Sequence, residues 1–330
     1  FRNTLAEPVE RAEINIQNAG GTVGIVWADD VQLRTAIPVL YDQMPDTRAE
    51  RPRTLLFSPM NITYLHDTAE HWAASGFRGF LFDGVMASWP SDVWATDGDA
   101  ASRDETDALL QELRKCNAEC RRHGIDSNII KVAFYDELPD WFDDNAWQTL
   151  TENFRQGARF ASMSGCIGIA IDTEYIAQQY SPDWSGYEGL QHDAAALKAC
   201  VRARWRGVIG AMLEAYPDMV LFTLPAGMLH YGDLYTDLFA GMLQACTEAD
   251  APGGLHVMTE STYHVTDLEV LEDFPVRVDS FIREQCSASM SDYWQRRGSV
   301  AMGVWPLGYY RAIVGGDGTF AGYSGRAEEF

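Results

Sequence analysis

Residues 167–175 read Ile-Gly-Ile-Ala-Ile-Asp-Thr-Glu-Tyr, a short apolar run that leads directly into two carboxylates. A continuous apolar run of this length is typical of a parallel strand that is covered on both faces. Comparable runs recur along the chain, and segments with helical signals lie between them. The eight runs are Thr22–Trp27, Thr54–Ser58, Gly79–Phe82, Ile129–Tyr135, Ile167–Ile171, Met219–Leu224, Leu255–Met258 and Val300–Val304.

Strand–helix alternation of this kind predicts an α/β fold with a parallel sheet. Eight such units would close a (βα)8 TIM-type barrel, and 330 residues suit one barrel. Thr22–Trp27 could instead form a strand outside the barrel, which would leave an irregular barrel with seven clear strands. We therefore distinguish an N-terminal segment, residues 1–53, with a first strand and helix, from a barrel domain, residues 54–330. The two are expected to form one domain.

Helix boundaries between the strands follow from capping residues. A capping box at Ser102 and Glu105 begins a helix that stops at His123-Gly124. Two further helices are predicted over Asp193–Tyr216 and Val278–Arg297, ended by a proline and a glycine respectively.

The composition limits the classes of partner. The formal net charge is −23, with 48 acidic and 25 basic residues, so a phosphate backbone would be repelled and nucleic-acid binding is not expected. No apolar run approaches the roughly 18 residues of a membrane span. The sequence starts at Phe1, so a signal peptide can have preceded it, and we expect a secreted or periplasmic protein. Cys116 and Cys120 lie four residues apart on a predicted helix and are expected to be buried thiols.

Functional groups of such barrels emerge just beyond the carboxyl ends of the strands. A ring rich in carboxylates follows the predicted strands, and it favours proton transfer and stabilisation of positive charge. Two of its members, Asp172 and Glu174, are two residues apart and point to the same face of a strand. Because crowded carboxylates resist double ionisation, one of them suits a general acid. The ring consists of Asn61, Asp83, Asp136, Asp172, Glu174, Glu260 and Trp305.

The segment Gly168–Tyr175 resembles the fourth-strand signature of chitinase-type glycoside hydrolases, family eighteen, a Gly-Ile-Asp-Ile-Asp-Trp-Glu-Tyr run that ends in the catalytic acid. The resemblance implies that Glu174 is the proton donor and that Asp172 orients an acetamido group of the substrate and supports the acid. Ala170 and Thr173 depart from the signature, which has aspartate and tryptophan there. Val300–Leu307 is similar to the last strand of the family, which carries a sugar-stacking tryptophan, here Trp305. The resemblance implies a glycosidase-like barrel, and a chitinase in the strict sense is not expected.

Glu260 is the second candidate catalytic carboxylate. It directly follows the run Leu255–Met258 and its Thr259, a position that resembles the nucleophile of many barrel glycosidases. If Glu174 and Glu260 face each other, one protonates the leaving oxygen while the other attacks the sugar or activates water. We favour attack and retained configuration, because Glu260 should sit close beneath the sugar. A substrate-assisted route through Asp172 is the alternative.

The remaining candidates would bind the sugar, since aromatic faces bury the apolar C–H faces of sugar rings and polar groups bind the hydroxyls. No metal-ligand spacing, glycine-rich phosphate loop or serine-nucleophile motif occurs, so neither a metal nor a cofactor is expected. The predicted substrate-binding residues are Asn61, Asp83, Asp136, Tyr175, His230, Tyr263, Trp305 and Tyr309.

The sequence therefore predicts a glycoside hydrolase that acts on a poly- or oligosaccharide by two-carboxylate catalysis. Two other classes stay open. One is a carbohydrate-binding barrel that lacks catalysis, because the signature is altered at Ala170 and Thr173. The other is a metal-dependent lyase, isomerase or aldolase with Asp83, Asp136, Asp172 and a histidine as ligands.

Overall fold

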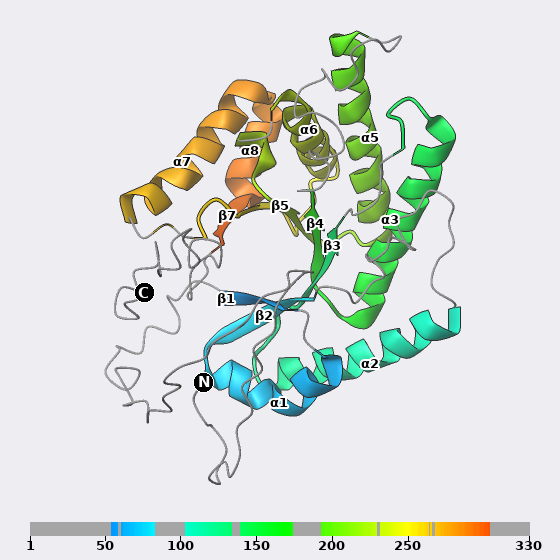
Figure 1. Ribbon diagram of the computed structural model, residues 1–330, viewed down its shortest axis with the longest axis vertical. Helices are drawn as coiled ribbons and strands as arrows, with labels where there is room; N and C mark the ends of the chain where they lie inside the picture. Colours follow the sequence, from blue (N-terminus) through cyan, green and yellow to red (C-terminus); the bar gives the residue numbers. More distant parts are fainter. Residues whose placement is uncertain are drawn as a thin grey trace, which may run out of the picture. The chain divides into compact units, whose positions relative to one another are not determined.

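The structure is a computed structural model of the chain. It describes residues 54–58, 61–82, 103–133, 139–173, 193–229, 232–263, 265 and 268–303. Within these residues seven strands form one parallel sheet in the order β1-β2-β3-β4-β5-β6-β7, so that strands adjacent in sequence are adjacent in the sheet. The sheet curls, and the helices lie along its outer side (Figure 1).

The seven strands coincide with seven of the eight predicted runs. They are β1 Thr54–Ser58, β2 Phe77–Phe82, β3 Ile129–Ala133, β4 Gly168–Asp172, β5 Val220–Leu224, β6 Leu255–Thr259 and β7 Ser299–Met302. The parallel α/β sheet is thus confirmed. The eighth run, Thr22–Trp27, and the whole segment 1–53 lie outside the described residues, so the closed eight-stranded barrel and the division of the chain stay predictions.

Helices alternate with the strands as the capping signals indicate. Asp193 caps the helix predicted over 193–216, accepting a hydrogen bond from the backbone N–H of Ala196 at 2.7 Å. The helix that follows the capping box ends at Arg122, and Gly124 adopts φ +85°, a left-handed conformation that glycine tolerates best. The helices are α1 Ile62–Ala74, α2 Arg103–Arg122, α3 Asp144–Ser164, α5 Ala194–Ala215, α6 Asp233–Glu248, α7 Leu268–Gln285 and α8 Ala288–Arg297.

The prediction of one helix over Val278–Arg297 is wrong. The chain forms two helices there, and they meet at Cys286 and Ser287. Ser287 has extended backbone angles, and its hydroxyl accepts a hydrogen bond from the N–H of Met290 at 3.4 Å, which starts α8 afresh. A serine competes for backbone hydrogen bonds in this way, and the helical periodicity on both sides concealed the break.

The strands are apolar on both faces because each face packs against a different cluster. Outward side chains join the main core beneath the helices, which also takes up Cys116 and Cys120, both fully buried as predicted. Inward side chains form a smaller cluster, which we call the inner cluster. Its buried members are Leu81, Ile129, Ala170, Phe222 and Leu224, with Leu55, Ile167, Val220, Met258 and Ala301 packed against them.

The amino-terminal end of the sheet is tightly packed. A Cβ on Gly168 would lie 1.8 Å from the carbonyl oxygen of Val220, so glycine lets β4 begin close against β5. His256 donates from Nε2 to the carbonyl of Gly253 at 2.9 Å, and its Nδ1 lies 2.7 Å from Oγ of Ser299. Burial lowers the pKa of His256, so the ring is neutral there. In barrels of this kind functional groups lie at the opposite, carboxyl end of the strands.

Candidate active site at the carboxyl ends of the strands

Two charged side chains meet on the inner face of the sheet, Lys131 of β3 and Asp172 at the end of β4. Each stands two residues after a member of the inner cluster, Ile129 and Ala170 respectively, and therefore shares its face. Lys131 pairs in register with Ala170, one step below Asp172, so its long side chain extends toward the carboxyl end. Its Nζ lies 3.0 Å from Oδ2 of Asp172.

This ion pair is almost completely buried. The side chains of Lys131 and Asp172 are 5% and 4% exposed. A charge in such surroundings costs several kcal/mol unless an opposite charge and hydrogen bonds compensate it. Asp172 is predicted from the sequence, and Lys131 is not. The sequence does contain a signal for Lys131, because it is one of only three lysines in the chain and stands in the middle of an apolar strand. A buried cation requires an anion nearby, so this position predicts an ion pair.

An exposed aromatic ring adjoins the ion pair. Nζ of Lys131 lies 4.9 Å from the ring centroid of Phe57, near the end of β1. Phe57 is 49% exposed, and among the large apolar side chains exposed in the described ranges it alone lies on a strand. The cation–π contact holds the ammonium from a second side. The ring also offers a flat apolar surface beside the charges, and no sequence pattern predicted it.

The backbone directly after Asp172 is held by three hydrogen bonds. The N–H and the hydroxyl of Thr173 both donate to the carbonyl of Leu224, at 2.6 and 3.0 Å. The hydroxyl of Tyr235, buried on α6, donates to the carbonyl of Thr173. Thr173 stands where the chitinase-type signature has tryptophan, and here it ties β4 to β5. These three hydrogen bonds, which we call the clamp, hold the main chain from which Asp172 projects.

If the carboxylates at this end of the sheet are catalytic, Tyr235→Phe should lower kcat by about 10-fold, because loss of the clamp lets Asp172 drift from its position. The free energy of unfolding should fall by about 1–2 kcal/mol, since a buried carbonyl loses its donor. Tyr216→Phe is the matched control. The hydroxyl of Tyr216 donates to the carbonyl of Cys166 at 3.1 Å, just before β4 at its other end. Urea unfolding should show a comparable loss for both variants, and steady-state kinetics a loss of turnover for Tyr235→Phe alone. Equal turnover in the two would contradict a role for the clamp.

Glu260 lies directly after β6 and is half-buried. The N–H of Tyr263 donates to the carbonyl of Glu260 at 3.1 Å and closes a turn. The hydroxyl of Thr262 donates to the carbonyl of Gly303 at 2.7 Å, and the N–H of Gly303 donates to Oγ1 of Thr259 at 3.1 Å. A Cβ on Gly303 would lie 2.1 Å from the carbonyl oxygen of Thr259, so only glycine permits this approach. The turn that carries Glu260 and Tyr263 is thus fastened to the end of β7.

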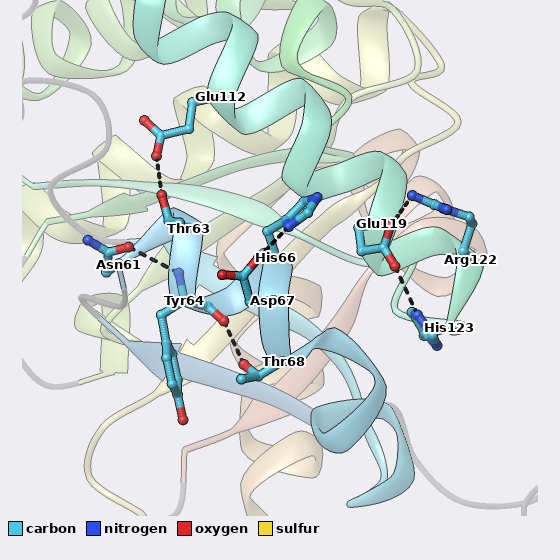
Figure 2. Close-up of polar contacts among 10 residues, drawn as sticks. All are labelled: Asn61, Thr63, Tyr64, His66, Asp67, Thr68, Glu112, Glu119, Arg122 and His123. Carbon is cyan, nitrogen blue, oxygen red and sulfur yellow. Dashed lines mark hydrogen bonds and ion pairs between the residues drawn. The ribbon is translucent and has the colours of Figure 1, made fainter.

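Asn61 lies at the start of α1, after the carboxyl end of β1, and is exposed. Its side-chain oxygen accepts a hydrogen bond from the N–H of Tyr64 at 3.1 Å, and so it caps the helix (Figure 2). Two residues after Asn61, the hydroxyl of Thr63 donates to Glu112 at 2.8 Å and ties α1 to α2. Helix capping explains the contact of the Asn61 side-chain oxygen, and a contact of Asn61 with a sugar stays a prediction.

The other predicted site residues lie outside the described residues, and their roles stay predictions. They are Glu174, Asp83, Asp136, Tyr175, His230, Trp305 and Tyr309. Of the three predicted catalytic carboxylates, Asp172 and Glu260 are described, each directly at the carboxyl end of its strand.

Metal ligands and thiols are other reactive groups in the described part of the chain. No three His, Cys, Asp or Glu side chains gather there in a way that could hold a metal ion. Burial raises the pKa of Cys166 to about 11 and that of Cys246 to about 12, so these thiols are protonated at neutral pH and are poor nucleophiles. Among the described helices, none has the length and apolarity needed to cross a membrane.

Comparison with known proteins yields distant structural likenesses. No family model and no curated protein matches the chain. CpGH84B, whose designation marks a glycoside hydrolase, is 9% identical, with a TM-score of 0.42 over 84% of this chain, which spans 49% of that protein. A provisionally assigned lyase/mutase from Burkholderia cenocepacia is 18% identical, with a TM-score of 0.35 over 83% of this chain and 87% of its own. A provisionally assigned sugar phosphate isomerase/epimerase from Anabaena variabilis is 8% identical, with a TM-score of 0.39 over 77% and 84%. Likeness at this level carries no argument about activity.

Proposed function

We propose that the protein is a glycoside hydrolase whose active site lies at the carboxyl ends of the strands. The observation that supports this most is the Lys131–Asp172 pair, which keeps a carboxylate at the end of β4, two residues before Glu174. A second carboxylate, Glu260, follows β6 on a fastened turn. A fixed anion at the same end of the sheet as Glu260 suits a reaction that develops positive charge on a sugar ring.

In the proposed reaction Glu174 gives its proton to the glycosidic oxygen as the bond from that oxygen to the anomeric carbon breaks. Glu260 attacks the anomeric carbon from the opposite side and forms a glycosyl ester. Water then cleaves the ester, returning its proton to Glu174 and releasing Glu260, and the sugar leaves with retained configuration. Neutral poly- or oligosaccharides are the proposed substrates, because a net charge of −23 disfavours anionic ones.

Reducing-end release from a panel of neutral polysaccharides tests the function. Turnover by the wild-type chain is expected on at least one member, and Glu174→Gln should lower it by roughly 100-fold or more while sugar binding survives. Glu248→Gln is the control. Glu248, on the surface of α6, pairs with Arg206 at 2.7 Å, and this variant should retain turnover. Wild-type turnover by Glu174→Gln would exclude Glu174 as the acid.

The same panel separates the other two classes of function. Sugar binding without release of reducing ends by the wild-type chain would indicate a carbohydrate-binding barrel. Activity lost in chelator and restored by a divalent cation would indicate the metal-dependent class. The structure gives a reason to prefer the hydrolase over the latter, because the Lys131 ammonium occupies Oδ2 of Asp172 and would repel a metal ion there.

A further inference from the structure

We propose that Lys131 is a positioning residue, whose ammonium keeps Asp172 ionised and in one orientation, so that Asp172 supplies fixed negative charge and takes no part in proton transfer. The inference rests on the proposed function and deepens it, because it assigns the charge state of one of the crowded carboxyl groups. The spacing of Asp172 and Glu174 in the sequence does not indicate which of the two carboxyl groups carries the proton.

The distance between the two charged groups supports the assignment. A distance of 3.0 Å between Nζ and Oδ2 is that of a charge-assisted hydrogen bond, in which the ammonium donates to the carboxylate. A protonated Asp172 would leave the ammonium facing a neutral group in a nearly water-free setting, where the interaction of opposite charges is strongest. The pair is therefore most stable with both members charged.

The surroundings also restrict movement of the ammonium. The Lys131 stem rises from the inner cluster, and Nζ contacts both the Asp172 carboxylate and the ring of Phe57. Across the sheet, Ala133 pairs with Asp172 and Ala170 pairs with Lys131. Oδ2 of Asp172 is engaged by this contact, and the clamp at Thr173 holds its main chain. Both the carboxylate and the main chain of Asp172 are therefore held in place.

A chemical consequence follows for the reaction. A carboxylate that is held ionised cannot deliver the proton to the leaving oxygen, so the acid must be a different carboxyl group, with Glu174 the proposed donor. Fixed negative charge at the carboxyl end of β4 stabilises the positive charge that develops at the anomeric carbon. Lys131 acts on this step through Asp172 and does not act on the substrate itself.

A double-mutant cycle on turnover tests the inference. The variants are Lys131→Met, Asp172→Asn and the double variant, each corrected for its folded fraction by circular dichroism. Each single change is expected to lower kcat by roughly 100-fold with KM within about 3-fold, because a carboxylate displaced by about 1 Å can lose that much. If Lys131 acts through Asp172, the double variant should also lose about 100-fold, since the second change removes nothing further.

Multiplied losses, about 10,000-fold in the double variant, would overturn the proposal, because Lys131 would then act independently of Asp172. Lys131→Arg guards against a folding failure of Lys131→Met. It keeps the cation, and it should recover kcat to within about 10-fold of wild type. An arginine variant that folds but is as inactive as Lys131→Met would also count against the proposal. Failure of the proposed function would look different, since the wild-type chain itself would then release no reducing ends.

Discussion

Lys131→Met should lower the free energy of unfolding by about 3–5 kcal/mol, the largest stability loss that we expect from any single side chain of the site. The change removes the ammonium from a carboxylate that is 4% exposed and cannot gain water in exchange. The melting temperature should fall on the order of 10 °C, as follows from the usual relation between stability and melting temperature for a chain of this size. Urea unfolding followed by circular dichroism measures the first quantity and calorimetry the second.

Two companion variants show whether burial of charge is the cause. Lys131→Met combined with Asp172→Leu removes both charges, and its stability should return to within about 1–2 kcal/mol of wild type, because apolar replacements of a buried pair are often neutral. Arg206→Met breaks the surface pair with Glu248, whose members are 52% and 45% exposed, and should cost at most about 1 kcal/mol. A single variant as stable as wild type would contradict the buried pair.

Glu260→Ala should lower turnover by roughly 100-fold or more, and azide should restore part of it. Azide fills the space of the missing carboxylate and attacks the anomeric carbon in its place. The product is expected to be a glycosyl azide of inverted configuration, because one displacement replaces two. Proton magnetic resonance of the released sugar identifies that product, and it would establish Glu260 as the nucleophile.

Glu272→Ala is the control for this experiment, since Glu272 is exposed on α7 and should neither lose turnover nor yield azide product. Near-normal hydrolysis by Glu260→Ala would contradict the nucleophile role. The substrate-assisted route through Asp172 would then be the better account, with Glu174 as the acid.

Local sequence patterns were sufficient to predict the strands of the parallel sheet. The strands of a parallel sheet are largely covered on both faces, so each is predominantly apolar, and this leaves a readable run at β1 as well as at β4. Capping is also local, and Asp193 and Gly124 marked helix ends correctly. The same reasoning failed at Ser287, because a cap between two amphipathic helices resembles an ordinary helical serine.

The sequence by itself determined which carboxylates end which strands, and hence that Asp172 and Glu260 belong to one end of the sheet. Only the tertiary structure decided their partners. Lys131 is 41 residues from Asp172 in sequence, Tyr235 is 62 from Thr173, and Gly303 is 41 from Thr262, and each contact joins different elements. No local pattern encodes such contacts, because the register between neighbouring strands and the packing of α6 against the sheet create them. Charge compensation inside a protein is a property of neighbours in space, and the chain order does not reveal it.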